Sequence, residues 1–253
     1  MILAKTLRVS IAFGAVLLTA GTGGHAQDIS PVFDMAGLAN TASMGAVINS
    51  ERARAARMGA PTMRGMPMPP PGRAFMRPAP PAAATVSMRY SAPPALRQDV
   101  VSEFVDRVRR HSPENARLIQ AQLAQHDYRR IYDEIVRPYG LAGDDAANAL
   151  AAYIVLGWMI VHDGQAPPPD AVRGVRAQAS VALTDSRLSS VEMHARLGEE
   201  FKILFVTVHA GWQSARREGN LGRYAAGVAD MFRNLDGIDL RAMDLGPAGF
   251  QAG

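Results

Sequence analysis

The chain has 253 residues, of which 48% are hydrophobic, 20% charged and 6% aromatic, and it carries a formal net charge of +4 and no cysteine. This length and composition suffice for one or two folded domains and exclude collagen-like, coiled-coil and disulfide-scaffold proteins. Without cysteine the chain also cannot form disulfides, thiolate zinc sites, iron–sulfur clusters, a thiol nucleophile or a lipid-modified N-terminal cysteine.

The N-terminus has the pattern of a cleaved secretory signal peptide. Lys5 and Arg8 precede an uncharged apolar stretch over residues 9–20, and small residues follow it before Gln27. The apolar stretch has 12 residues, fewer than the about 20 that a membrane span needs. We therefore expect residues 1–26 to be a signal peptide and the mature protein to be periplasmic or secreted, without an integral membrane span. An uncleaved N-terminal anchor is the alternative.

The positive charge is concentrated in the middle of the chain. Residues 51–97 contain eight arginines and one acidic residue, Glu51, which gives a net charge of +7. Residues 98–253 contain 17 basic and 20 acidic residues, so this part is mildly acidic at −3. A nucleic-acid-binding domain is expected to carry a basic patch on its folded surface. The distribution therefore argues against nucleic acid as a partner.

Residues 59–94 have the composition of a linker. They include ten prolines, and because proline lacks an amide donor and fixes its backbone angle, this density opposes helix and sheet and favours extended polyproline II. We expect a disordered, semi-rigid spacer rich in proline, methionine and arginine. The preceding residues 27–58 are expected to be weakly helical or disordered.

Methionines also gather in this linker, and three of them are candidate metal ligands. Thioethers are soft ligands that suit Cu(I), and Met63, Met66 and Met68 are close enough in an extended chain to meet on one ion. Against such a site, no histidine lies nearby and the surrounding arginines repel a cation. We therefore favour a low-complexity tether and keep Cu(I) binding as the alternative.

From residue 95 to residue 253 the hydrophobic pattern predicts a helical domain. Apolar residues recur at spacings of three and four, with helices expected to begin near residues 95, 113, 128, 146, 171, 190 and 221. The candidate N-terminal caps are Ser112, Asp127, Asp170 and Ser190. The tail over 238–250 is expected to form a turn or short helix, and nothing after residue 95 predicts a sheet. The expected fold class is all-α, a compact bundle of about six or seven helices.

Residues 146–161 form the most apolar segment of this domain. Sixteen residues that are apolar all round are too few for a comfortable membrane span, so we predict a buried central helix. Trp158 follows Leu150 and Ile154 at intervals of four, and Trp212 lies in a similar stripe on the helix that begins near residue 190. Both tryptophans are therefore predicted to lie in the core.

Several short motifs stand at turns and core positions of the same region: Met88-Arg89-Tyr90-Ser91, Pro138-Tyr139-Gly140-Leu141 followed by Asp144 and Asp145, the Trp158 helix, Gly237–Met243, and Gly249-Phe250. On these residues the chain from about 86 to 250 resembles a helical domain found at the C-terminus of exported bacterial proteins, a family of unknown function. The resemblance implies an exported helical domain and supplies no catalytic residues.

The remaining polar residues give no recognisable catalytic pattern. Adjacent side chains on a helix point about 100 degrees apart, so the acidic pairs Asp133-Glu134, Asp144-Asp145 and Glu199-Glu200 are poorly placed to act together as acid and base. Asp144-Asp145 is better explained as helix capping. Gly-x-Ser-x-Gly, HExxH and a phosphate-binding loop are missing from the sequence. No catalytic, cofactor-binding or metal residue is therefore assigned, and no cofactor is expected.

The histidines likewise give no recognisable metal site. None has a partner at the spacing of four that a metal site on one helix needs. Solvated or capping positions are therefore expected for the five that follow the signal peptide: His111, His126, His162, His194 and His209.

Two functions remain. The first, which we favour because the sequence has no recognisable nucleophile, metal or cofactor pattern, is a non-catalytic exported interaction module that binds a protein or an envelope component. The second is an envelope hydrolase whose site is assembled from dispersed residues. A closed bundle without a polar cleft favours the first, and a pocket that gathers His126, Asp133 or Glu200 favours the second. The partner's identity, the oligomeric state and the choice between periplasm and medium stay open.

Overall fold

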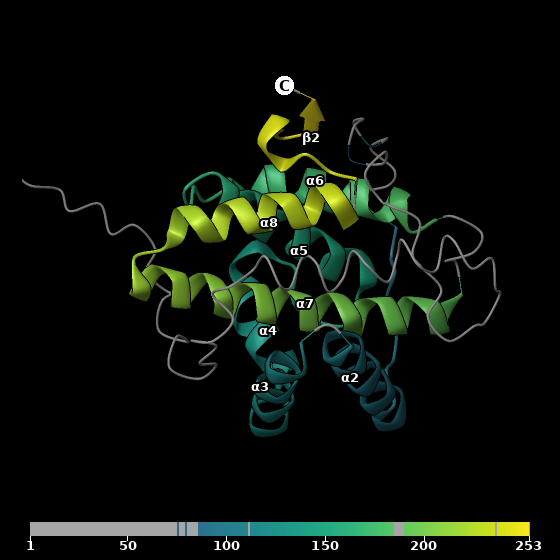
Figure 1. Cartoon of the computed structure of the whole chain (residues 1–253). Coiled ribbons are helices and arrows are strands. Elements are labelled where there is room, and N and C mark those ends of the chain that lie inside the picture. The colour runs from purple at the N-terminus through teal and green to yellow at the C-terminus, as the bar shows by residue number, and fades with distance from the viewer. Residues whose placement is uncertain are drawn as a thin grey trace, which may run out of the picture.

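A computed structural model of the chain describes residues 75, 79, 86–110, 112–184, 190–235 and 237–252 (Figure 1). Within these residues the fold is a bundle of seven α-helices with one small sheet, which confirms the predicted class. The predicted signal peptide, residues 27–58 and the candidate ligands Met63, Met66 and Met68 lie outside the described residues. The helices are α2 (Pro94–Arg109), α3 (Pro113–Gln125), α4 (Tyr128–Val136), α5 (Ala146–Val161), α6 (Pro169–Ala182), α7 (Val191–Glu218) and α8 (Leu221–Leu235).

Side-chain caps fix where several helices begin. The Oγ of Ser112 and of Ser190 and the carboxylate of Asp127 accept amide hydrogen bonds at the starts of α3, α7 and α4. Such bonds satisfy amides that have no partner within the helix. Asp170 is not a cap, because α6 already begins at Pro169, whose missing N–H suits the first turn. Asp170 lies in that first turn instead.

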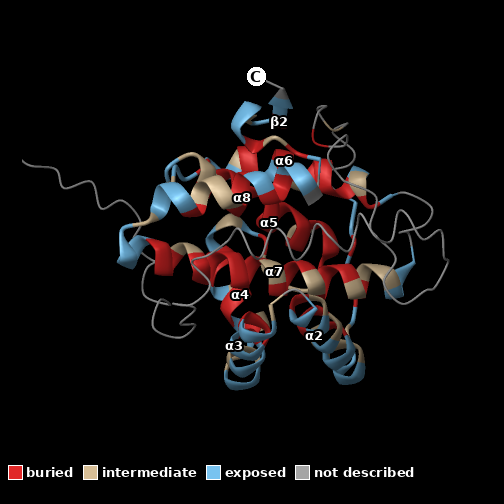
Figure 2. Cartoon of the chain, in the orientation of Figure 1, coloured by how far each residue is buried: buried red, intermediate tan, exposed pale blue. Residues whose placement is uncertain are grey.

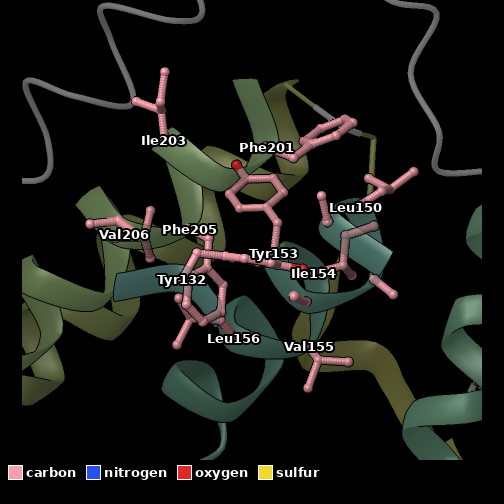
Figure 3. Close-up of a cluster of buried hydrophobic side chains, with 14 of the residues drawn as sticks. Tyr132, Leu150, Tyr153, Ile154, Val155, Leu156, Phe201, Ile203, Phe205 and Val206 are labelled. Carbon is pink, nitrogen blue, oxygen red and sulfur yellow. The ribbon is translucent and has the colours of Figure 1, made fainter. Parts of the chain in front are cut away.

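The centre of the bundle is α5, which packs against α6, α7 and α8. Its residues are buried on nearly all sides (Figure 2), as the sequence predicts. Figure 3 shows part of the buried apolar cluster. Tyr132 of α4 packs edge-to-face on Phe205 of α7, and Tyr153 of α5 stacks on Phe201 of α7. Among the described residues, no helix has both the length and the apolar character needed to cross a bilayer.

The two tryptophans differ in burial. Trp158 is 6% exposed, and its indole N–H donates to the main-chain oxygen of Met243 at 3.0 Å. Trp212 is only partly buried, at the edge of the core, with the Arg216 guanidinium 5.7 Å from its ring centroid. The core assignment therefore holds fully for Trp158 and in part for Trp212.

The C-terminal tail differs from its prediction. A 3-10 turn over Leu240–Ala242 leads into two antiparallel strands, β1 (Met243–Gly246) and β2 (Gly249–Ala252), so the expectation of no sheet is wrong here. Each strand has four residues, which is the lower limit of the about four to eight over which alternation indicates a strand. The Gln178 side chain on α6 accepts from the N–H of Phe250 and donates to its carbonyl, both at 2.8 Å. A glycine on α6, Gly174, allows β2 to approach the helix, because a Cβ there would lie 2.2 Å from the amide nitrogen of Gly249.

Residues 86–90, called here the N-terminal segment, are part of the packed domain although they fall within the range expected to be linker. Met88 and Tyr90 are 4% and 8% exposed. The N–H of Tyr90 donates to the carbonyl of Asp144, and the N–H of Ala146 donates to the carbonyl of Met88, both at 3.0 Å. Phe75 is also buried and packs edge-to-face on Phe250. Extended chain alternates its side chains between two faces, so buried apolar residues can stand beside exposed ones even in a proline-rich stretch.

Candidate functional site

A buried carboxylate, Glu199 on α7, is the centre of a charged cluster. It is fully buried. The hydroxyl of Tyr90 donates to its Oε1 at 2.8 Å, and the hydroxyl of Tyr128 on α4 donates to its Oε2 at 2.6 Å. Burial, followed by the charge of Glu199 and these hydrogen bonds, raises the pKa of both tyrosines well above the ordinary value. Both hydroxyls therefore remain protonated donors.

Lys202 lies one helical turn along α7 from Glu199 and is 1% exposed. Its Nζ donates to Oδ1 of Asp144 at 2.5 Å and to Oε1 of Glu199 at 3.3 Å. The ammonium is also 5.3 Å from the ring centroid of Tyr90 and 5.6 Å from that of Tyr132. A cation can be attracted to aromatic faces at this distance, so carboxylates and aromatic rings together replace the water that the lysine loses.

Arg129 on α4 completes the cluster. Its guanidinium forms an ion pair with Asp144, and its Nε lies 3.3 Å from Oε2 of Glu199. Burial disfavours the charged form of Asp144, but hydrogen bonds from Arg129 and Lys202 outweigh that effect and hold the pKa of this carboxyl below its usual value. Two acids and two bases thus neutralise one another.

This buried charged cluster, made of Tyr90, Tyr128, Arg129, Asp144, Glu199 and Lys202, joins four parts of the chain. They are the N-terminal segment, α4, the loop before α5, and α7. The next residue, Asp145, caps α5 through the amides of Ala147 and Asn148 and also accepts from the N–H of Met88. Capping therefore explains Asp145, whereas Asp144 belongs to the cluster.

A surface pocket with a volume of about 470 Å³ opens beside the cluster. Tyr90, Arg129 and Asp144 belong both to the cluster and to the pocket wall. The remaining lining residues are Arg89, Asp127, Arg130, Asp133, Glu134, Arg137 and Gly143. Part of the wall is consequently held by a buried hydrogen bond from Tyr90 and by half-buried ion pairs of Arg129 and Asp144.

The three residues considered for a hydrolase do not gather in this pocket. Asp133 lines it, and its Oδ1 accepts from the N–H of Gly143 at 2.8 Å. Glu200 instead pairs with Arg107 on α2 at 2.5 Å. His126 ends α3 as its C-terminal cap and is not among the lining residues.

The basic and aromatic members of the cluster are not among the residues that the sequence patterns single out. One signal was available: Lys202 is the only lysine after residue 5, in a chain that has 25 arginines. It stands inside the apolar stripe that contains Phe201 and Phe205. A compact ammonium in such a position indicates a buried partner of opposite charge.

Two histidines depart from expectation: His194 on α7 is half-buried, with its Nε2 enclosed and without a hydrogen-bond partner in the described part of the chain, and His209 departs further. His162 ends α5 and stacks on Trp158 with ring centroids 4.4 Å apart, and His111 lies outside the described residues. His209, however, is neither solvated nor capping: it is 6% exposed within α7, beside Gln213. Burial, and to a smaller degree the charge of Arg216, lowers its pKa to about 4. Within the described part of the chain, no three His, Asp or Glu side chains are placed to hold a metal ion.

The buried histidine should make stability depend on pH. Between about pH 6.5 and pH 4 the unfolded chain binds a proton at His209 that the folded chain does not, so stability is full above pH 6.5 and falls as the pH drops. The loss attributable to this group approaches about 3 kcal/mol at pH 4. Urea unfolding across this range measures it, and His209→Gln should flatten the dependence. An unchanged slope in that variant would contradict the assignment.

Comparison with known proteins gives no family assignment. The sequence matches no protein-family model, and neither the curated proteins nor the solved structures provide a match.

Proposed function

We propose that this protein is a non-catalytic exported helical module that binds a partner, a protein or an envelope component, through the pocket beside the buried charged cluster. The observation that carries the proposal is that Tyr90, Arg129 and Asp144 contribute to the pocket wall while being fixed by buried and half-buried interactions. A wall held in one arrangement loses little conformational freedom when a ligand binds.

The chemistry of the lining residues supports binding over hydrolysis. A general base works best with a pKa near the operating pH, whereas Arg129 and Lys202 hold the pKa of Asp144 below its usual value. The raised pKa of Tyr90 makes its hydroxyl a poor proton donor to a leaving group. Of His126, Asp133 and Glu200, only Asp133 lines the pocket, and its carboxylate accepts from the N–H of Gly143.

Export itself is supported by the sequence pattern of residues 1–26. The basic start, short apolar stretch and small residues before Gln27 are typical of a signal peptide. The resemblance to exported helical domains points the same way.

Site-specific photo-cross-linking tests the proposal. A cross-linking residue replaces Glu134, which is exposed, lines the pocket and pairs with Arg130 four residues earlier. The control position is Asp230 on α8, also exposed and paired with an arginine, Arg233. In cells that express the full chain, we expect a discrete adduct of the exported protein from position 134 and none from position 230. Equal adducts at both positions, no adduct at 134, or a chain retained in the cytoplasm with residues 1–26 intact would contradict the proposal.

A further inference from the structure

We infer that the pocket recognises carboxylate groups, and that its ligand is an acidic peptide segment of the partner. This inference rests on the proposed function and specifies the chemistry of the same site. It follows from the partners of the charged side chains that line the pocket.

The acidic side chains of the pocket are already engaged. Asp127 accepts from the amides of Arg129 and Arg130 at the start of α4, and Asp133 accepts from the Gly143 amide. Asp144 is paired with Arg129 and Lys202. Glu134 pairs with the exposed Arg130 at 3.0 Å, a surface pair of small net strength that a ligand can exchange.

Two of the basic side chains are not engaged. Arg89 and Arg137 are exposed and line the pocket, and neither forms an ion pair or side-chain hydrogen bond with the described residues. Arg89 lies between the buried residues Met88 and Tyr90, on backbone that bridges to Asp145. Arg137 directly follows α4. Both guanidiniums are therefore carried by fixed backbone and available to a ligand.

The geometry of guanidinium favours carboxylate. Its fork of N–H donors matches the two oxygens of a carboxylate, and such charge-assisted bonds are stronger than neutral ones. The pocket has a volume of about 470 Å³, which leaves room for acidic side chains of a peptide. Because residues 98–253 carry a net charge of −3, long-range attraction does not favour an anion. Residues 51–97, by contrast, carry a net charge of +7 and attract a polyanion, so the arginine variants, and not binding alone, locate the site.

The test uses fluorescein-labelled hexaglutamate and the mature chain, with binding followed by fluorescence anisotropy. We expect Arg89→Gln combined with Arg137→Gln to weaken binding by at least about tenfold, as expected for two lost charge-assisted contacts. The matched control is Arg117→Gln combined with Arg173→Gln, two exposed arginines on α3 and α6 outside the pocket. It should change the affinity less than about twofold. Circular dichroism melts of both variants should match that of the parent, since all four side chains are exposed.

Three results would overturn the inference: no binding by the parent chain, equal losses in the two double variants, or displacement of hexaglutamate by inorganic phosphate at the same concentration as by free hexaglutamate. The last result would show that the site recognises an isolated anion and not a peptide. A cross-link at position 134 together with any of these results would leave the proposed function standing and remove only the acidic ligand. If position 134 gives no cross-link but hexaglutamate binds as expected, the proposed function fails and the acidic ligand stands.

Discussion

Replacement of Lys202 by methionine should destabilise the fold by about 3–5 kcal/mol, the cost typical of removing one partner from a buried ion pair. Lys202 is 1% exposed and donates to both Asp144 and Glu199. Methionine fills a similar volume but supplies no positive charge. The carboxylate of Glu199 is then buried with Arg129 as its remaining cationic neighbour.

Chemical unfolding of the purified variant gives the free energy directly. The informative control is the double variant Lys202→Met with Glu199→Gln, which removes a negative charge together with the positive one. We expect it to be more stable than Lys202→Met alone, because a neutral amide costs less to bury than an unpaired carboxylate. A single variant within about 1 kcal/mol of the parent would show that the lysine is not a structural charge.

Replacement of Trp158 by alanine should cost about 3–5 kcal/mol. The indole is 6% exposed, donates to the main-chain oxygen of Met243 at 3.0 Å and stacks on His162. Its loss would leave a cavity beside α5. It would also remove the hydrogen-bond donor to the buried carbonyl of Met243 at the start of β1. In a domain of this size that should lower the melting temperature by roughly 10 °C or prevent soluble expression.

Two companion variants separate the causes. Trp158→Phe keeps most of the ring and removes the N–H donor, so its smaller loss measures the bond to Met243. Trp212→Ala should cost less than Trp158→Ala, because Trp212 is only partly buried. A parental melting temperature for Trp158→Ala would refute the central position of α5.

Local signals were enough to predict the helical framework. Ser112, Asp127 and Ser190 cap the helices that their positions predicted, since a cap depends on residues only two or three positions away. The uniform apolarity of residues 146–161 likewise predicted the buried helix. Asp170 does not cap α6, because the preceding residue, Pro169, already occupies the first helical position.

Features held by distant contacts were missed. The Tyr90–Glu199 hydrogen bond joins residues 109 positions apart, and the Gln178 bonds to Phe250 span 72 positions. No pattern within a helix turn or strand reports such pairings. The sequence therefore predicted neither the charged cluster nor the β1–β2 sheet. The position of β2 against α6 depends on Gln178 and Gly174.

The central claim is that the buried charged cluster is one coupled unit that fixes the pocket wall. A double-mutant cycle on unfolding free energies tests it most directly, with Tyr90→Phe and Glu199→Gln singly and together. We predict a coupling of about 1 kcal/mol or more, as expected for a buried hydrogen bond to a charged group. The control cycle pairs Tyr90→Phe with Tyr224→Phe, whose hydroxyl donates to Val208 at 2.7 Å outside the cluster, and it should be additive. Additive effects for Tyr90 and Glu199 as well would contradict the claim.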